Sequence, residues 1–254
     1  MSRTVSSTAG PCDLVVFAAH PDDAELNCGG TLLLGADQGW KTAVVDFTRG
    51  ELSTRGTPER RANETDEASH VLGLSYRVNL GLADGHLHDS DENRQAVVRL
   101  LRSMRPRVVI APPLEDHHAD HVAVARILES SLYLSGVEKY CPDADPWRPH
   151  TLLHYVGSRS VAPQIVVDIS SVHERRTRAV LSYRSQFHDP QSEERPTRIS
   201  HPEFLDWVNG ALKHYGLLIG ASYGEGYTSP EPVPVFNLVE QLGRVRWEQS
   251  KVGD

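Results

Sequence analysis

Apolar and polar positions alternate along this chain in a way that is typical of α/β proteins. Short apolar runs, such as DLVVFAA at 13–19 and KTAVVDFT at 41–48, are each followed by a longer amphipathic stretch. Short apolar runs fit buried parallel strands, and the amphipathic stretches fit the helices that connect them. The predicted strands are 13–19, 41–48, 76–80, 107–111, 151–156 and 164–169, and the predicted helices are 25–38, 59–72, 92–104, 120–134, 172–183 and 202–217.

This order of elements predicts the fold class. Strands alternate with helices through the first half of the chain, which favours an α/β, Rossmann-like, mostly parallel sheet with helices on both faces. A chain of 254 residues with 39% hydrophobic content is long enough to bury one sizeable core, so we expect a single domain over 1–254. The polar residues 1–12 are expected to form a flexible N-terminal segment, and the polar, Pro-containing stretch 187–198 an exposed loop.

Composition excludes several classes of function. Charges of both signs are spread along the chain and the formal net charge is -8, so nucleic acid and anionic membranes are not expected partners. No apolar run approaches the roughly 20 residues of a spanning helix, and the start lacks a signal-peptide segment, so we expect a cytoplasmic protein. The three cysteines are widely spaced and outside any C-x-x-C pattern, which indicates neither a disulfide framework nor a Cys-based zinc site.

A first cluster of chemically active residues follows the first predicted strand. It reads His20-Pro21-Asp22-Asp23-Ala24-Glu25 and leads into the first helix, which is where ligands bind in open α/β sheets. His20 and Asp23 are three residues apart, so the imidazole and the carboxylate can converge, while Asp22 points elsewhere. That division suits a pair of metal ligands plus a free base.

A second cluster, EDHHADH at 115–121, follows the strand predicted at 107–111. Parallel strands have their carboxyl ends at one edge of the sheet, so the two clusters can meet there. Two His and one carboxylate form a known catalytic zinc set that leaves a fourth position open. Either cluster alone would be explained by a helix cap or a solvated loop, but both at equivalent strand ends favour a metal site.

These residues also resemble a known family. The signatures A-H-P-D-D-x-E and H-P-D-H of the PIG-L or LmbE-like zinc deacetylases are matched by His20 to Glu25 and His118 to His121. The segments TRGELSTRGTPE at 48–59, NLGLADG at 79–85 and SYRSQF at 182–187 look like the bacillithiol-pathway branch. The resemblance implies a Rossmann-like deacetylase that acts on N-acetylglucosaminyl malate, a small glycoconjugate, and forms a homo-oligomer, often a hexamer.

The resemblance also assigns roles position by position. It implies that zinc (Zn2+) is held by His20, Asp23 and His121. It implies that Asp22 is the general base, and that His118 stabilises the tetrahedral intermediate or helps the amine to leave. The residues in segments that resemble substrate-facing loops are Arg49, Glu51, Arg55 and Asp84.

Three departures from the family pattern affect the expected substrate. Ala119 stands where the second signature has Pro, and His117 stands where several bacillithiol enzymes have Arg. If that Arg contacts the malate, His117 would bind the carboxylates more weakly near neutral pH, because an imidazole is then mostly uncharged. Near the end of the chain, GEGY at 224–227 differs from the expected Gly-Glu-x-Phe.

Alternative interpretations remain at this stage. A nucleotide-binding Rossmann domain is disfavoured because no G-x-G-x-x-G follows the first strand, and Gly29 and Gly30 fall within a predicted helix. A non-catalytic metal-binding or sugar-binding module would not need the free base Asp22. The nearest alternative is a deacetylase of another N-acetylglucosamine conjugate, such as a mycothiol-type inositol conjugate or a chitooligosaccharide.

Overall fold

The computed structural model describes residues 9–157 and 161–243. The strands are β1 (Leu14–Ala18), β2 (Thr42–Thr48), β3 (Tyr76–Leu82), β4 (Val108–Ala111), β5 (Thr151–Tyr155), β6 (Ile165–Asp168) and β7 (Gly224–Thr228). The helices are α1 (Asp23–Asp37), α2 (Pro58–Leu72), α3 (Asp91–Met104), α4 (Ala119–Ser135), α5 (His173–Leu181), α6 (Phe204–Leu218) and α7 (Leu238–Leu242). Every element predicted from the sequence is present, with each boundary within two residues of the predicted one.

All seven strands form one sheet, in the order β3-β2-β1-β4-β5-β7-β6. Strands β1 to β5 pair parallel with one another, whereas β7 pairs antiparallel with both β5 and β6. The predicted mostly parallel sheet is therefore confirmed. Since β1 and β4 are neighbours, the turns that follow them lie next to each other at the carboxyl edge.

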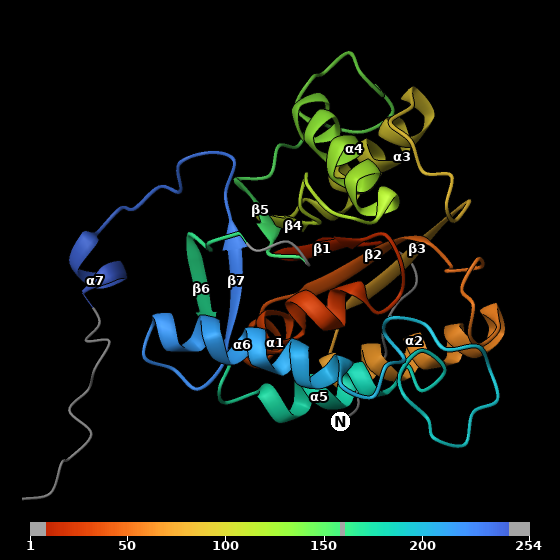
Figure 1. Ribbon diagram of the computed structural model, residues 1–254. Helices are drawn as coiled ribbons and strands as arrows, with labels where there is room; N and C mark the ends of the chain where they lie inside the picture. The colour runs from red at the N-terminus through yellow and green to blue at the C-terminus, as the bar shows by residue number, and fades with distance from the viewer. Residues whose placement is uncertain (1–8, 158–160, 244–254) are drawn as a thin grey trace, which may run out of the picture.

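The sheet is covered on both faces, as the alternation along β1 requires. Val16 and Ala18 belong to a core shared with α1 and α5, whereas Val15 and Phe17 belong to a second core shared with α3 and α4. Figure 1 shows α3 and α4 above the sheet and α1, α2, α5 and α6 below it. The prediction of helices on both faces is confirmed.

A buried ion group lies beside the start of α1. Arg77 on β3 donates to both carboxylate oxygens of Asp46 on β2, at 2.8 and 2.9 Å, and to Glu25 of α1 at 2.5 Å. Burial raises the pKa of Asp46, and the Arg77 guanidinium opposes that rise. One guanidinium thus joins two strands to the helix that carries the HPDD turn.

Three features differ from, or lie beyond, the predicted pattern. Strand β7 was not predicted, because GEGYT contains two glycines and becomes a strand only by pairing between β5 and β6. Cys12, at the end of the segment expected to be flexible, is buried and donates its N–H to the carbonyl of Met104, while residues 1–8 of that segment lie outside the described residues. None of the described helices combines the length and apolarity required to cross a bilayer.

Candidate metal centre and active site

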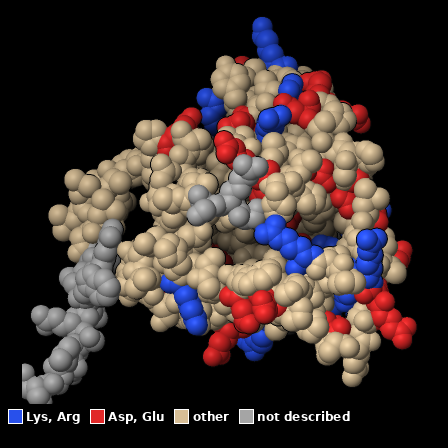
Figure 2. Space-filling view, viewed as in Figure 1, with Lys and Arg blue, Asp and Glu red and all other residues tan. Residues whose placement is uncertain are grey.

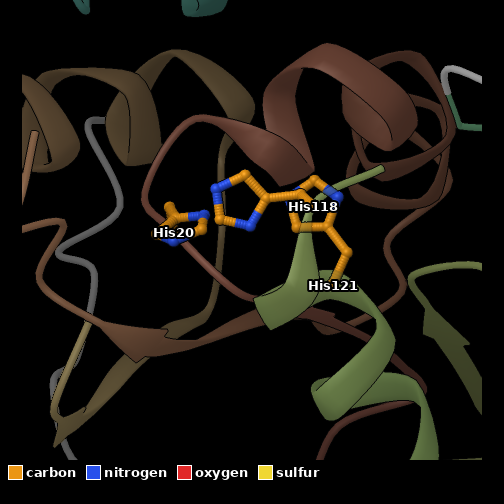
Figure 3. Close-up of side chains that lie close together, drawn as sticks. All are labelled: His20, His118 and His121. Carbon is orange, nitrogen blue, oxygen red and sulfur yellow. The ribbon is translucent and has the colours of Figure 1, made fainter. Parts of the chain in front are cut away.

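Two strand-to-helix turns come together at the carboxyl edge of the sheet. The turn after β1 carries His20, and the turn after β4 carries His118 and leads to His121 in the first turn of α4. The ring centroids of His20 and His118 are 4.7 Å apart, and those of His118 and His121 are 4.8 Å apart. The three imidazoles therefore form one cluster, as Figure 3 shows, and each offers a ligand atom close enough for a shared metal ion.

The side chain of Asp23 completes a possible metal-binding set. Its Oδ2 lies 3.4 Å from Nδ1 of His20 and 3.3 Å from Nε2 of His121. In a tetrahedral zinc site with bonds of about 2.0–2.1 Å, neighbouring ligand atoms are about 3.3 Å apart. The spacing and the nitrogen and oxygen donors of these three residues thus fit a four-coordinate metal such as zinc.

Carboxylates lie behind both imidazoles of this set. Nε2 of His20 is 3.0 Å from Asp84 and 3.3 Å from Asp120, and Nδ1 of His121 is 3.4 Å from Asp116. Partners of this kind fix the ring orientation and the tautomer of a metal-binding His. Asp84, which was predicted to face the substrate, thus contacts His20 through one carboxylate oxygen. Its second oxygen accepts the backbone N–H of Leu52.

The charges around the imidazoles are strongly negative. Burial lowers the pKa of His20, but hydrogen bonds to Asp120, Asp23 and Asp84 outweigh burial and raise this pKa to about 12. Burial likewise lowers the pKa of His121, and Asp23 and Asp116 raise it to about 10. The carboxylates therefore favour positive charge in the space between the imidazoles, which is the charge that a divalent metal ion carries.

Asp22 has a different environment from Asp23. It stands at the N-cap of α1 with φ 114°, a left-handed conformation that is costly for a residue with a side chain. Its Oδ2 accepts a hydrogen bond of 2.7 Å from Nη2 of Arg61, and Arg61 also donates to the carbonyl of Pro21. Burial raises the pKa of Asp22 to about 7, although the Arg61 guanidinium opposes this rise.

His118 caps α4 and faces the same cavity. Its Nδ1 accepts the backbone N–H of Asp120 at 3.3 Å, so in the neutral ring the proton is on Nε2. Burial and the neighbouring His20 and His121 lower the pKa of His118. The ring is therefore arranged to donate a hydrogen bond from Nε2.

These groups line one end of a cavity of about 800 Å³. Its opposite wall is the apolar side of α6, and the face shown in Figure 2 is hollowed just above the place that α6 has in Figure 1. A cavity of this size holds a small glycoconjugate. The α6 residues that line it are Phe204, Trp207, Val208, Ala211, Leu212 and Tyr215.

The cavity lining includes Asp84 but not Arg49, Glu51 or Arg55, which were also predicted to face the substrate. Arg55 is buried, donates to the carbonyl of Ser185 at 3.0 Å and has its Nη2 3.9 Å from Glu194, so it ties two loops together. Glu51 accepts the backbone N–H of Asp84 at 3.0 Å and that of Arg49 at 3.1 Å, and thereby holds the loop after β2. These contacts of Arg55 and Glu51 position loops beside the cavity, and a substrate contact of Arg49, Glu51 or Arg55 stays a prediction.

His117, in contrast, does line the cavity, together with an arginine that the sequence analysis missed. Nη1 of Arg198, in the loop between α5 and α6, donates to Nε2 of His117 at 3.1 Å. Arg198 has no ion-pair partner among residues 9–157 and 161–243. The loop that was expected to be exposed therefore brings a cation to the rim of the site.

Sequence reasoning also missed Arg61, Asp116 and Asp120. Arg61 follows another arginine in a polar helix, and periodicity alone does not tell which of the two is buried. Asp116 and Asp120 lie within the second cluster, but their spacing did not reveal that they would support the imidazoles. The signal that was present is a surplus of carboxylates around three histidines.

Comparison with known proteins agrees with this arrangement. Residues 15–132, which include both turns, match the family model PIG-L, described as GlcNAc-PI de-N-acetylase. The chain is 27% identical to the diacetylchitobiose deacetylase of Thermococcus kodakarensis, over 82% of this chain and 79% of that one. It is 26% identical to 1D-myo-inositol 2-acetamido-2-deoxy-alpha-D-glucopyranoside deacetylase 2 of Saccharopolyspora erythraea, over 80% of this chain and 91% of that one.

A solved structure extends the likeness over most of the molecule. The conserved protein TT1542 from Thermus thermophilus is 40% identical and superposes with a TM-score of 0.81, covering 88% of this chain and 97% of that one. At this identity and coverage the likeness is one of family as well as of fold. The chain belongs to the PIG-L/LmbE family of N-deacetylases.

Proposed function

We propose that this enzyme is a zinc-dependent hydrolase that removes the N-acetyl group from an N-acetylglucosaminide, most specifically N-acetyl-α-D-glucosaminyl L-malate in bacillithiol biosynthesis. One observation carries the proposal. Asp23 lies within 3.4 Å of a nitrogen of both His20 and His121, whereas the adjacent Asp22 is held by Arg61 and stays available as a base.

The residues present account for both halves of amide hydrolysis. Zinc in this ligand set supplies the Lewis acidity that activates a water and an amide carbonyl. Asp22 takes the proton that the water loses as its oxygen attacks the acetyl carbon, a step worth about 10²–10⁴ in rate. Cleavage of the C–N bond then releases acetate, and the amine leaves with a proton.

His118 acts on the other side of the reacting carbon. Because the backbone N–H of Asp120 occupies Nδ1, Nε2 carries the proton and donates to the negative oxygen that forms on attack. One such donor contributes about 3–4 kcal/mol to stabilising the transition state in comparable sites. His118 keeps this proton throughout, and the proton that the departing amine needs is the one that Asp22 has taken from the water.

The malate conjugate is favoured by charge at the rim of the cavity. Arg198 offers a guanidinium that has no carboxylate partner among the described residues, and His117 lies beside it. A guanidinium binds a carboxylate through two parallel hydrogen bonds, which neutral inositol or a second neutral sugar cannot accept as strongly. Arg198 therefore supplies a guanidinium beside position 117.

Acetate release from purified, zinc-loaded protein tests this proposal. The substrates are N-acetylglucosaminyl malate, the inositol conjugate, diacetylchitobiose and free N-acetylglucosamine, compared by kcat/KM. We expect the malate conjugate to have the highest value. A preference of tenfold or more for the inositol conjugate or diacetylchitobiose would reassign the substrate, and no acetate from any of the four would overturn the deacetylase assignment.

We also propose that the enzyme works in the cytoplasm as a single-domain homo-oligomer. Phe236, Leu238 and Val239, in the segment after β7, are exposed by 89%, 67% and 79%, and an assembly would give them a partner. Light scattering coupled to size-exclusion chromatography measures the mass in solution. A mass of 28.2 kDa at micromolar concentration would contradict the oligomer.

A further inference from the structure

Helix α1 contains two adjacent glycines that the catalytic chemistry does not explain. Gly29 and Gly30 lie in its middle, where each glycine costs about 1 kcal/mol relative to alanine. A Cβ built on Gly30 would lie 2.5 Å from Ile169 and 3.0 Å from a carboxylate oxygen of Glu225. A Cβ on Gly29 would lie 3.0 Å from Arg176. The glycines therefore allow Ile169 and two charged side chains to approach the helix closely.

One of these side chains bonds to the backbone of the helix interior. Glu225, on β7 and only 1% exposed, accepts the N–H of Gly30 at 2.7 Å and the N–H of Thr31 at 2.8 Å. It also accepts the hydroxyls of Thr31 and Tyr227. An N–H in the middle of a helix normally bonds to the carbonyl four residues earlier, which for Gly30 is that of Leu26.

That carbonyl is bound by the second charged side chain. Nη2 of Arg176, on α5 and also 1% exposed, donates to the oxygen of Leu26 at 2.5 Å. Both members of the helical pair Gly30 N–H and Leu26 C=O therefore have a side-chain partner. Two buried charged side chains thus hold the backbone of α1 at the same turn.

The site lies immediately before this point. Asp22 and Asp23 open α1, and Leu26 and Asn27, one turn later, line the cavity. We propose that Glu225 and Arg176 are positioning residues: bonded to the backbone in the middle of α1, they set the direction of its first turn and with it the place of Asp23. The inference rests on the proposed role of Asp23 as a metal ligand. It gives the GEGY segment at 224–227 and the Gly29-Gly30 pair one common function, which is to position the first turn of α1.

The substitution Glu225→Gln tests the inference, because the amide keeps the shape of the carboxylate but cannot accept from both N–H groups. Thr31→Val is the matched control, since it removes a hydroxyl bond to the same carboxylate and leaves both backbone bonds. We expect Glu225→Gln to weaken the zinc Kd at least tenfold, measured by chelator competition on folded protein, and Thr31→Val to change the Kd less than twofold. An unchanged zinc Kd in folded Glu225→Gln overturns the inference.

Two further measurements keep the test decisive. Arg176→Met frees the other end of the same pair and is expected to weaken zinc binding similarly, so it replaces Glu225→Gln if that variant does not fold. In the metal-free protein, the amide proton of Gly30 is expected to move upfield in Glu225→Gln, because a carboxylate acceptor is lost; an unmoved resonance counts against the inference. Neither the zinc Kd nor the amide resonance of Gly30 depends on a substrate, and the resonance is measured without zinc. A wrong substrate or metal assignment would therefore not be mistaken for failure of this inference.

Discussion

Nη2 of Arg61 donates a 2.7 Å hydrogen bond to Oδ2 of Asp22, while the next carboxylate along the chain, Asp23, faces two imidazoles. Adjacent residues of one turn thus have different partners. The left-handed backbone at Asp22 makes this possible, because it turns the first side chain toward α2 and leaves the second at the imidazoles. Each carboxylate can be changed separately, which makes the assigned roles testable.

Replacement of Asp22 by Asn is expected to leave zinc bound and to lower kcat by about 10²–10⁴. The amide still accepts from Arg61 but cannot take a proton from water. Metal analysis and acetate release on the same preparation measure both quantities. Asp37→Asn, at an exposed ion pair with Arg175, is the control and is expected to behave like the wild type. Near-normal turnover in Asp22→Asn would remove Asp22 from the mechanism.

The substitution His121→Ala is expected to reduce bound zinc to well below one ion per chain. It removes one of the three proposed ligands and leaves the carboxylate of Asp23 with a single imidazole. Zinc content of the dialysed protein is the measurement. His188→Ala, which changes an exposed histidine outside the cavity lining, should keep full occupancy. Equal zinc in both variants would rule out the proposed ligand set.

Zinc is expected to stabilise the folded protein, because metal-free protein holds several carboxylates close together. At a free zinc concentration about 100 times Kd, binding contributes about 2.7 kcal/mol. For a domain of this size that corresponds to a rise in Tm of about 5–10 °C. Differential scanning calorimetry with zinc or with a chelator measures the difference. Asp23→Ala should lose the rise, and a rise retained in that variant would place the metal elsewhere.

Loss of the Arg198 guanidinium is expected to affect anionic substrates only. In Arg198→Ala, kcat/KM for the malate conjugate should fall about 10- to 100-fold, which matches the loss of a charge-assisted hydrogen bond of roughly 1.5–3 kcal/mol. The value for the neutral inositol conjugate should change less than twofold. Arg195→Ala, in the same loop but outside the cavity lining, is the control. An equal fall in kcat/KM for both substrates would mean that Arg198 holds the loop in place and does not bind the aglycone.

The buried ion group beside α1 is expected to be costly to break. Arg77→Met leaves Asp46 and Glu25 without their cation in the interior, and the free energy of unfolding should fall by about 3–5 kcal/mol. Arg99→Met, which removes an exposed pair with Asp143, should cost less than about 1 kcal/mol. Urea unfolding followed by circular dichroism compares the two variants. Similar losses in the two variants would show that burial does not determine how much these ion pairs contribute to the free energy of unfolding.

The sequence allowed the fold and the metal-ligand candidates to be predicted, because each depends on local patterns. Apolar runs located the parallel strands, and the carboxyl ends of parallel strands necessarily share an edge, so His20 and His121 could be paired across a hundred residues. Strand β7 could not be found in this way, since its glycines disfavour a strand until β5 and β6 pair with it. Nor could the loop contacts of Arg55 and Asp84 be predicted, because no periodicity records which loop a buried side chain will contact.

Arg55 joins the loop after β2 to the segment 185–194, and the same segment continues to Arg198 at the rim of the cavity. These two stretches of chain are therefore hydrogen-bonded to each other at several points. We expect a substitution at position 55 to shift the rim, although Arg55 does not line the cavity. Preference for one aglycone over another is therefore expected to depend also on a residue outside the cavity lining.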